Sequence, residues 1–479
     1  MKRMSRREFS TNAGRAALGL AGAAYAQRSG PAGSQAAAGK PPNIIFILAD
    51  DWGWGDLRCY GHRQLKTPNL DRLARQGVLF TQFYVCSGVC SPSRTAFMTG
   101  HFPARHGIHG HIATLQQNEA RGMPDYLDAS VPNVAQLLHD AGYATAHFGK
   151  WHLGTGPRAP SPDKYGFDAH KTNIGTMAKR DGWNFWDPKE PGWRARSTEL
   201  IMDETIGFVE ANRDRPFYVQ AWLWDTHARL QPTEEQMKPY QRFRGALRIY
   251  YSAATAADAQ IGRLLAKLDE LGLADNTIVI FSSDNGPEDI VIGNASEHGV
   301  GSAGPFRGRK RSLYEGGVRV PFIVRWPAGT PAGKVDDTSV IAGVDFLPTM
   351  CKLTGVDLPE GLNLDGEDMS DALRGNPRER TTPLMWEWRF RVHGHVINQS
   401  PMLAIREGKW KLLMNPDRSR VELYDIPSDP SELSNLADRY PEVVKRLSER
   451  LLAWQATLPE GPVEEVAGSN AYPWPRSEG

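Results

Sequence analysis

One short segment places a thiol where a helix is expected to begin: Cys90-Ser-Pro-Ser-Arg94. Pro92 suits the first position of a helix, and the residues from Arg94 to Met98 can continue it. Cys90 is therefore expected at or just before the helix N-terminus, where free backbone N–H groups and the helix dipole favour an anion. The alternative is that Cys90 is a small buried side chain without a chemical role.

Two predicted strands end in side chains that offer oxygen ligands. An apolar run over residues 43–49 stops at Asp50-Asp51, and a second run over residues 277–283 stops at Asp284-Asn285. Hard oxygen donors suit Ca²⁺ or Mg²⁺, whereas Zn²⁺ prefers histidine and cysteine. A single aspartate after a strand is as readily a turn former or a helix cap. Two such endings favour a metal site.

The elements that must position these residues alternate between strands and helices. Two more apolar runs end in polar residues: 217–224 before Asp225-Thr-His227, and 144–148 before Gly149-Lys-Trp-His152. Helical patterns cover residues 67–77, 131–141, 198–211 and 248–271. This order predicts an α/β fold with a mainly parallel sheet covered on both faces. Because such sheets bind ligands beyond the carboxyl ends of their strands, the four polar endings are expected on one rim.

The pattern of predicted strands and helices changes near residue 376. Short β-prone runs over residues 383–390, 400–406, 410–414 and 421–425 precede an amphipathic helix over 441–457. We predict a catalytic domain over residues 41–376 and a smaller α+β subdomain over residues 377–479, built from an antiparallel sheet and a helix.

Composition excludes several classes of protein. The chain has 479 residues with a formal net charge of +1, which gives no strong field for nucleic acid or an acidic membrane surface. Its four cysteines are too few for a disulfide scaffold. The expected partners therefore include no nucleic acid.

The first 26 residues resemble a bacterial twin-arginine export signal. They carry Arg6-Arg7, a weakly apolar stretch from Ala16 to Ala23 and an A-x-A site at Ala24-Tyr-Ala26. The alternative is a disordered basic tail. Stable membrane insertion is not expected, because the apolar run is short and Arg15 interrupts it. Residues 27–40 are predicted to be a flexible leader. The protein is thus expected to be periplasmic or secreted, with the twin-arginine translocase as a partner.

Seven motifs, in order along the chain, resemble those of the type I formylglycine-dependent sulfatases, closest in texture to N-acetylgalactosamine-6-sulfatases and arylsulfatases. They are Asp50-Asp-Trp-Gly-Trp-Gly-Asp56, Lys66-Thr-Pro-Asn-Leu-Asp-Arg-Leu-Ala74, Cys90-Ser-Pro-Ser-Arg94, Met98-Thr-Gly100, Gly149-Lys-Trp-His-Leu-Gly154, Ser283-Asp-Asn-Gly286 and Tyr314-Glu-Gly-Gly-Val-Arg319. The resemblance runs from about Asn43 to about Leu458. It implies the alkaline phosphatase fold, a large mixed sheet between helices followed by a smaller C-terminal subdomain.

The resemblance also implies the cofactors. Cys90 would be converted to Cα-formylglycine (3-oxoalanine) by a formylglycine-generating or radical sulfatase-maturing enzyme, before a folded chain is exported. Its hydrate offers one oxygen to attack sulfur and a second hydroxyl whose deprotonation expels sulfate. Ca²⁺, with Mg²⁺ as the alternative, would be bound by residue 90 and by four oxygen donors: Asp50, Asp51, Asp284 and Asn285.

Further roles follow from the same motifs. Arg94 would stabilise the formylglycine and the metal, and Lys150 and Lys310 would hold sulfate oxygens. His227 would protonate the leaving alkoxide, for which a pKa near ~6.5 is suitable, and His152 would assist sulfate elimination. The loop after His227 departs from the family pattern, because Ala228-Arg-Leu230 follow it where many relatives have a nearby proline.

The substrate expected of an exported bacterial sulfatase is a sulfated saccharide. Additional contacts could come from His298, Arg307 and Arg389, whose alternative is solvated surface. Tryptophans such as Trp386 and Trp388 are better explained by packing than by sugar stacking. Two other functions are open: a phosphatase or phosphodiesterase of the same superfamily, which Cys90 and the oxygen-only ligands disfavour, and a catalytically silent glycan-binding protein if Cys90 stays a thiol.

Overall fold

The computed structural model describes residues 40–173, 183–187, 189–289 and 299–470. The twin-arginine segment, the leader up to residue 39 and the candidate contact His298 lie outside the described residues. From Lys40 onward the chain forms one unit.

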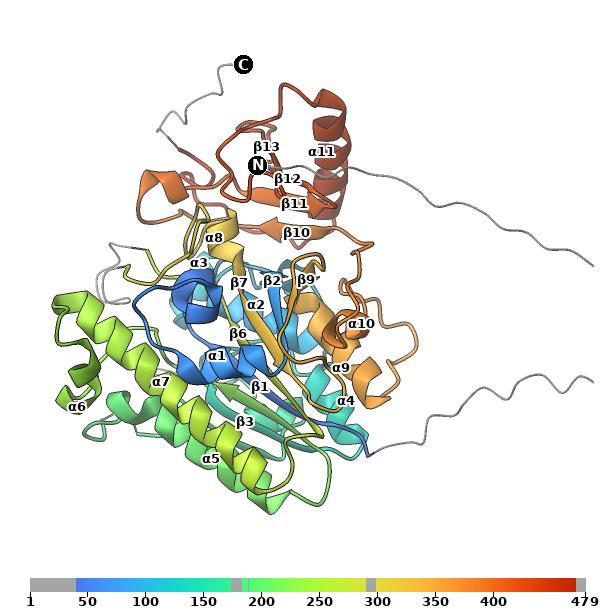
Figure 1. The fold of residues 1–479 in the computed structure, drawn as a ribbon. Helices are drawn as coiled ribbons and strands as arrows, with labels where there is room; N and C mark the ends of the chain where they lie inside the picture. Colours follow the sequence, from blue (N-terminus) through green and yellow to red (C-terminus); the bar gives the residue numbers. More distant parts are fainter. Residues whose placement is uncertain (1–39, 174–182, 188, 290–298, 471–479) are drawn as a thin grey trace, which may run out of the picture. The chain divides into compact units, whose positions relative to one another are not determined.

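A nine-stranded sheet occupies the centre of this unit (Figure 1). β1 (Asn43–Ala49) lies between β5 (Phe217–Trp222) and β6 (Thr277–Ser283) and is parallel to both. Beyond β5 follow β3 (Ala144–Lys150) and β4 (Ala169–Asn173), also parallel. Beyond β6, β7 (Arg319–Arg325) runs antiparallel to both of its neighbours, β6 and β2 (Val78–Tyr84), and the short strands β8 (Lys334–Asp336) and β9 (Ile341–Ala342) pair with β2. The predicted mainly parallel sheet is confirmed.

Both faces of this sheet are covered, as its continuous apolar strands require. The side chains of β1 alternate between two cores, with Ile44, Phe46 and Leu48 in one and Ile45, Ile47 and Ala49 in the other. The first core is closed by α2 (Cys90–Thr99), α4 (Val134–Asp140) and α9 (Phe346–Thr354). The second is closed by α1 (Pro68–Arg75), α5 (Ser197–Ala211) and α7 (Gly245–Glu270). Shorter helices are α3 (Leu115–Ala120), α6 (Glu234–Met237), α8 (Glu315–Val318) and α10 (Ser370–Leu373).

The C-terminal part forms a separate antiparallel sheet, as predicted. Its strands lie in the order β10 (Leu384–Glu387), β11 (Leu403–Glu407), β12 (Trp410–Met414) and β13 (Glu422–Asp425). Helix α11 (Pro441–Gln455) packs against β11 and β12. Within the described residues, no helix has both the length and the apolar character that crossing a membrane requires.

Several element boundaries differ from the predicted ones, and two of these differences lie close to Cys90 and the strand ends. Helix α2 begins at Cys90, so Pro92 is its third residue and not its first. Proline is tolerated there because the N–H groups of a helix's first turn have no partner within the helix. Strand β5 ends at Trp222, two residues early, because the chain then turns across the end of β1, where Leu223 N donates to Leu48 O at 2.7 Å.

Candidate active site

The polar ends of neighbouring strands meet on one rim of the large sheet. Ala49 and Ser283 are partners in the parallel β1–β6 ladder, so the residues that follow them leave the sheet side by side. Asp51 N donates to Asp284 Oδ1 at 3.3 Å, and Asn285 Nδ2 donates to Asp51 Oδ1 at 2.7 Å. The loop after β5 joins them, because Thr226 N donates to Asp50 O at 2.7 Å.

Two residues of this rim have left-handed backbone conformations. Asp51 has φ 64° and His152 has φ 55°. Aspartate tolerates this region better than most residues, whereas each such conformation generally costs about 1–3 kcal/mol. Surrounding contacts must hold both residues in place, which is a common property of functional sites.

Helix α2 brings Cys90 to the same rim. Cys90 is the first residue of the helix and only 3% exposed. Arg94 lies one turn later, on the same face of the helix. Its Nε and Nη2 donate to Asp284 Oδ2 at 3.0 and 2.7 Å, and its Nη1 donates to Lys150 O at 2.6 Å. Arg94 thereby fastens the start of α2 to the ends of β6 and β3.

Two buried lysines face the aspartates. Lys150 Nζ donates to Asp50 Oδ2, and Lys310 Nζ lies 2.5 Å from Asp51 Oδ1 and 3.4 Å from Glu288 Oε2. Burial alone would lower the pKa of Lys310, but the charges of Asp51 and Glu288 raise it above its ordinary value. Lys310 is therefore a cation at neutral pH.

The rim fits a hard divalent cation. Asp50 Oδ1, Asp51 Oδ2 and Asn285 Oδ1 are buried and have no hydrogen-bond partner among the described residues. Such orphaned acceptors are costly unless another group satisfies them. Burial and the charge of Asp50 also raise the pKa of Asp284 to about 8, although Arg94 opposes this rise. A cation among these oxygens would satisfy them and favour the ionised carboxylates, and an all-oxygen donor set suits Ca²⁺ or Mg²⁺.

The two predicted proton carriers are partly buried and neutral. His152 Nε2 lies 2.9 Å from Ile112 O, so this nitrogen carries the proton and Nδ1, which has no partner within the described chain, is the free base. Burial and the charges of Lys150 and Arg94 hold the pKa of His152 well below its usual value. Burial and Lys150 lower the pKa of His227 to about 4. The value near 6.5 expected for His227 therefore does not hold for the free protein.

His227 lies next to the carboxylates predicted to bind a metal. One ligand atom each from Asp50, Asp51 and His227 lie within 4.8 Å of one another. The loop that carries His227 is held by Arg194, which the sequence analysis missed. Arg194 Nη2 donates to His227 O at 2.5 Å and to Trp224 O at 3.1 Å.

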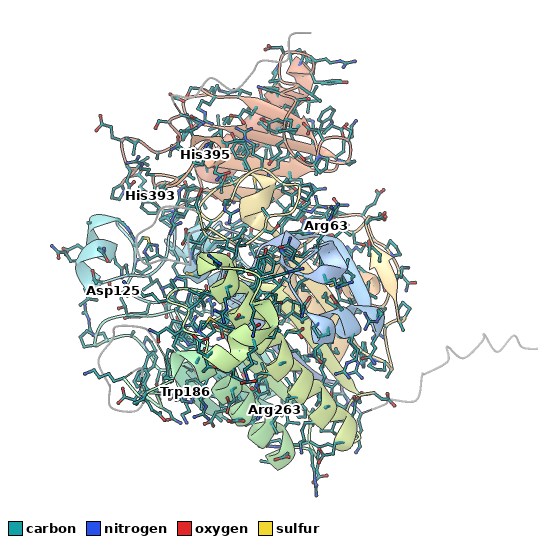
Figure 2. All side chains as sticks on the ribbon, turned by 60° about the vertical axis from the view of Figure 1, so that its left-hand side comes forward. Arg63, Asp125, Trp186, Arg263, His393 and His395 are labelled. Carbon is teal, nitrogen blue, oxygen red and sulfur yellow. The ribbon has the colours of Figure 1, made fainter. Side chains whose placement is uncertain are left out.

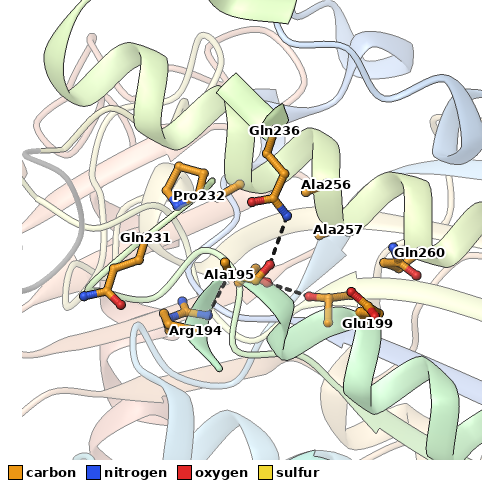
Figure 3. A pocket seen from close by; sticks show the side chains of 12 residues that line it. Arg194, Ala195, Glu199, Gln231, Pro232, Gln236, Ala256, Ala257 and Gln260 are labelled. Atoms are coloured by element: carbon orange, nitrogen blue, oxygen red, sulfur yellow. Dashed lines mark hydrogen bonds and ion pairs between the residues drawn. The ribbon is translucent and has the colours of Figure 1, made fainter. Parts of the chain in front are cut away.

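The same guanidinium spans the rest of the loop. Arg194 Nε donates to Arg229 O at 2.9 Å, and Nη1 donates to Asp225 Oδ1 at 2.9 Å. Figure 3 shows Arg194 on the wall of a pocket behind this loop, where Gln236 Nε2 donates to Ala195 O at 3.0 Å. No spacing or motif marks Arg194, because it precedes an ordinary helix and its partners are mostly backbone oxygens.

Arg307 and Arg389, the predicted outer contacts, lie among residues of the C-terminal part. Arg307 stacks on the Tyr314 ring at 3.7 Å and donates to Tyr424 Oη at 3.2 Å. Arg389 pairs with Glu387 at 2.9 Å and donates to Pro459 O. Both side chains are buried, and these contacts join segments of the chain. Trp386 and Trp388 are buried as well, at 1% and 3% exposure, which agrees with packing.

The sequence of this chain is similar to two family models and to characterised relatives. A family model described as sulfatase matches residues 42–356, and one described as the C-terminal part of N-sulphoglucosamine sulphohydrolase matches residues 303–457. The N-acetylgalactosamine-6-O-sulfatase of Bacteroides thetaiotaomicron is 30% identical over 86% of this chain and 92% of its own length. Arylsulfatase A of Homo sapiens is 31% identical over 91% and 92%.

Solved structures agree on the fold. Ps i-CgsB in complex with k-i-k-neocarrahexaose has a TM-score of 0.74 and 26% identity, covering 88% of this chain and 94% of that chain. The phosphonate monoester hydrolase of Agrobacterium radiobacter has a TM-score of 0.63 at 21% identity, covering 90% and 100%, which is a likeness of fold alone. The predicted fold class is thereby confirmed.

Proposed function

The chain belongs to the sulfatase family and is a sulfatase, and from this premise we propose that it removes sulfate from a sulfated carbohydrate by means of a formylglycine at position 90 and a bound Ca²⁺. The carbohydrate is suggested by relatives, one of which is an N-acetylgalactosamine-6-O-sulfatase and another a protein in complex with k-i-k-neocarrahexaose.

One observation carries the metal and nucleophile parts of this proposal. Three buried oxygens, on Asp50, Asp51 and Asn285, lack partners among the described residues. They lie on the rim to which Arg94 fastens the helix that begins with Cys90. This combination supports a cation beside residue 90, because an all-oxygen set of donors is what Ca²⁺ prefers.

The absent groups supply two functions. A formylglycine hydrate supplies the attacking oxygen, and Ca²⁺ supplies Lewis acidity and neutralises negative charge. Asp50, Asp51, Asp284 and Asn285 would hold the ion. Arg94, already bound to Asp284, keeps residue 90 in place.

The chain's own cations bind and orient the sulfate. Lys150 and Lys310 are buried, and each is paired with one aspartate of the rim. If a cation bound those carboxylates, the ammonium groups of Lys150 and Lys310 could donate hydrogen bonds to sulfate oxygens. In a buried site such donors stabilise developing charge more strongly than they would in water.

The two histidines divide the proton transfers. His152 Nδ1 is a buried free base, so it can accept a proton from residue 90 while Ile112 O holds the ring in position. His227 is neutral in the free protein, but a bound sulfate ester brings a negative charge that raises the pKa of a nearby imidazole. Once protonated, His227 can donate to the leaving alkoxide.

Maturation and export are part of the same proposal. Because Cys90 is only 3% exposed, a maturing enzyme must reach it before the chain closes. A twin-arginine signal over residues 1–26 would then carry a folded, matured protein out of the cytoplasm, to the periplasm or beyond.

The test begins with protein isolated from its native host. Mass spectrometry of the peptide containing Cys90 should show formylglycine, which is lighter than cysteine, and the protein should release sulfate from defined sulfated saccharides. Cys90→Ala should abolish this release, and chelation should reduce it until Ca²⁺ is restored. An unmodified thiol throughout active protein would contradict the nucleophile, and turnover of phosphate esters in preference to sulfate esters would contradict the reaction.

A further inference from the structure

The segment just outside the proposed sulfate pocket is tied to it at Ile112. Ile112 N donates to Ser91 Oγ at 3.0 Å, and Ile112 O accepts from His152 Nε2 at 2.9 Å. One residue is thus bonded both to the neighbour of Cys90 and to a proposed proton carrier. The preceding residue, His111, is only partly buried. His111 therefore lies where the pocket gives way to the surface.

Arg121, which follows α3, stands beside His111. Its Nη1 lies 3.4 Å from both His111 Nε2 and His111 O. Because a guanidinium can only donate, this contact leaves the imidazole proton on Nδ1, which is then a donor. The guanidinium also lies 5.4 Å from the centre of the Phe390 ring. A Cβ atom on residue 110 would lie 2.8 Å from that ring. Phe390 therefore packs closely against the backbone of Gly110.

Arg311 is bonded to the loop that precedes the nucleophile. Its N donates at 2.7 Å to Gly88 O, two residues before Cys90, and its φ of 76° is left-handed. Its guanidinium binds Glu288 at 2.5 and 3.1 Å, and Lys310 lies 3.4 Å from the same carboxylate. One carboxylate thus faces two cations.

The largest electrostatic effects on His111 come from cations. Burial and the charges of Arg121, Arg311 and Lys310 hold the pKa of His111 well below its usual value. Among the described residues, three carboxylates lie close to these cations: Glu288, bound to Arg311, Asp51, bound to Lys310, and Glu464, which accepts from Arg391 N at 2.7 Å and acts electrostatically on Arg121. Desolvation and the charges of Arg311 and Arg391 also lower the pKa of the exposed His393, which is labelled in Figure 2.

We propose that His111, Arg121 and Arg311 form a second anion-binding subsite beside the sulfate that is cleaved. The enzyme would then select saccharides that carry another anionic group, either a second sulfate or a uronate carboxylate, close to the scissile ester. This inference rests on the proposed function and deepens it. Guanidinium groups suit both anions, since their forked donors match sulfate and carboxylate oxygens.

The test compares matched disaccharides with the matured enzyme. All carry the same scissile sulfate: one has no other anion, one has a second sulfate and one has a uronate carboxylate. The wild-type enzyme should show a higher kcat/KM for at least one dianionic disaccharide than for the monoanionic one. Arg121→Gln should reduce that ratio by about tenfold, because a half-buried charge-assisted contact is lost. The dianionic disaccharide that loses its kcat/KM advantage in Arg121→Gln identifies the second anion.

Two further variants make the result decisive. Arg121→Lys keeps the charge but not the fork, so it should reduce the ratio less than Arg121→Gln does. Arg63→Gln removes an equal charge from an exposed loop well apart from His393 in Figure 2, and it should leave the ratio unchanged. An equal fall in Arg63→Gln, an unchanged ratio in Arg121→Gln, or a wild-type enzyme without the preference overturns the subsite. Failure to cleave any of the three disaccharides would instead count against the proposed function.

Discussion

Arg194 shows how a single side chain can hold the loop that carries His227, the proposed general acid. Its guanidinium holds oxygens of Trp224, Asp225, His227 and Arg229, so it braces the loop on both sides of His227. Loops that place functional groups need such bracing, because the backbone of a loop has no regular ladder of its own. Arg194 is thus a positioning residue for His227.

Arg194→Ala should slow cleavage of sugar sulfates by on the order of 100-fold in kcat, the scale of a misplaced general acid. The loss with 4-nitrophenyl sulfate should be much smaller, because nitrophenolate leaves without protonation. Parallel kinetics on the two substrates measure this difference. Arg196→Ala, which removes an exposed arginine paired with Glu199 at 3.0 Å, serves as the control. Equal losses on both substrates would show that Arg194 does not act through His227.

The residues that sequence reasoning found and those it missed differ in kind. Asp50, Asp51, Asp284 and Asn285 were predictable because oxygen ligands directly follow apolar strands, and the structure does bring these side chains together. Arg194 and the residues around His111, which are Arg121 and Arg311, were not predictable. Their partners are backbone oxygens or residues distant in sequence. The left-handed backbone at Asp51 and His152 also has no local signal, since neither residue is a glycine.

At the scale of elements, the motif around Pro68 has a structural explanation. Asp258 on α7 accepts hydrogen bonds from the first N–H groups of α1, Asn69 N at 3.1 Å and Leu70 N at 2.8 Å. One turn later, a side chain on Gly262 would begin 2.3 Å from the Asn69 side chain. The carboxylate therefore caps α1 from a different helix, and the small residue allows the two helices to approach.

Asp258→Ala should lower the free energy of unfolding by about 1–3 kcal/mol, since it leaves the N–H groups at the start of α1 without their acceptor. Chemical denaturation at pH 8 is suitable, because burial raises the pKa of Asp258 to about 6 and the group is ionised there. Glu270→Ala, on the same helix, removes an exposed carboxylate paired with Lys267 at 2.9 Å and should cost less than about 1 kcal/mol. Equal effects would contradict the cap.

Most elements were predictable because their apolar periods are clear. The strands at residues 43–49 and 277–283 match β1 and β6, and helix α7 differs from its predicted range by only a few residues. The placement of β7 was not predictable. It runs antiparallel between two strands that are parallel to each other, and such pairing depends on contacts between segments far apart in the chain.

At the scale of the whole unit, the two sheets are joined by buried polar groups. Trp386 Nε1 donates to Val85 O at 2.8 Å across the junction. Lys411 of β12 lies 2.9 Å from Glu315, which begins α8, and 2.9 Å from Glu432 in the C-terminal part. Two carboxylates thus share one ammonium in a site without exposure to solvent. Breaking such a group is costly, so it fixes how the two sheets pack.

This buried cluster should make stability depend on pH in a definite direction. Burial raises the pKa of Glu432 from an ordinary 4.5 to about 7, although Lys411 opposes the rise. Because the folded protein then holds this proton more tightly than the unfolded chain does, the stabilisation is complete below about pH 4.5 and is lost as pH rises through about 7. Between pH 5 and 8 the group should therefore cost up to about 3 kcal/mol.

Glu432→Gln removes that titration, so its free energy of unfolding should fall less between pH 5 and pH 8 than that of the wild-type protein. Denaturant unfolding of both proteins at the two pH values measures the difference, in which the contributions of all other groups cancel. Glu407→Gln removes a partly exposed carboxylate of β11 that is paired with Arg446 and Arg450 of α11. This variant should show the same change in unfolding free energy between pH 5 and pH 8 as the wild-type protein. Identical slopes in the wild-type protein and Glu432→Gln would show that the proton is not held at the junction between the sheets.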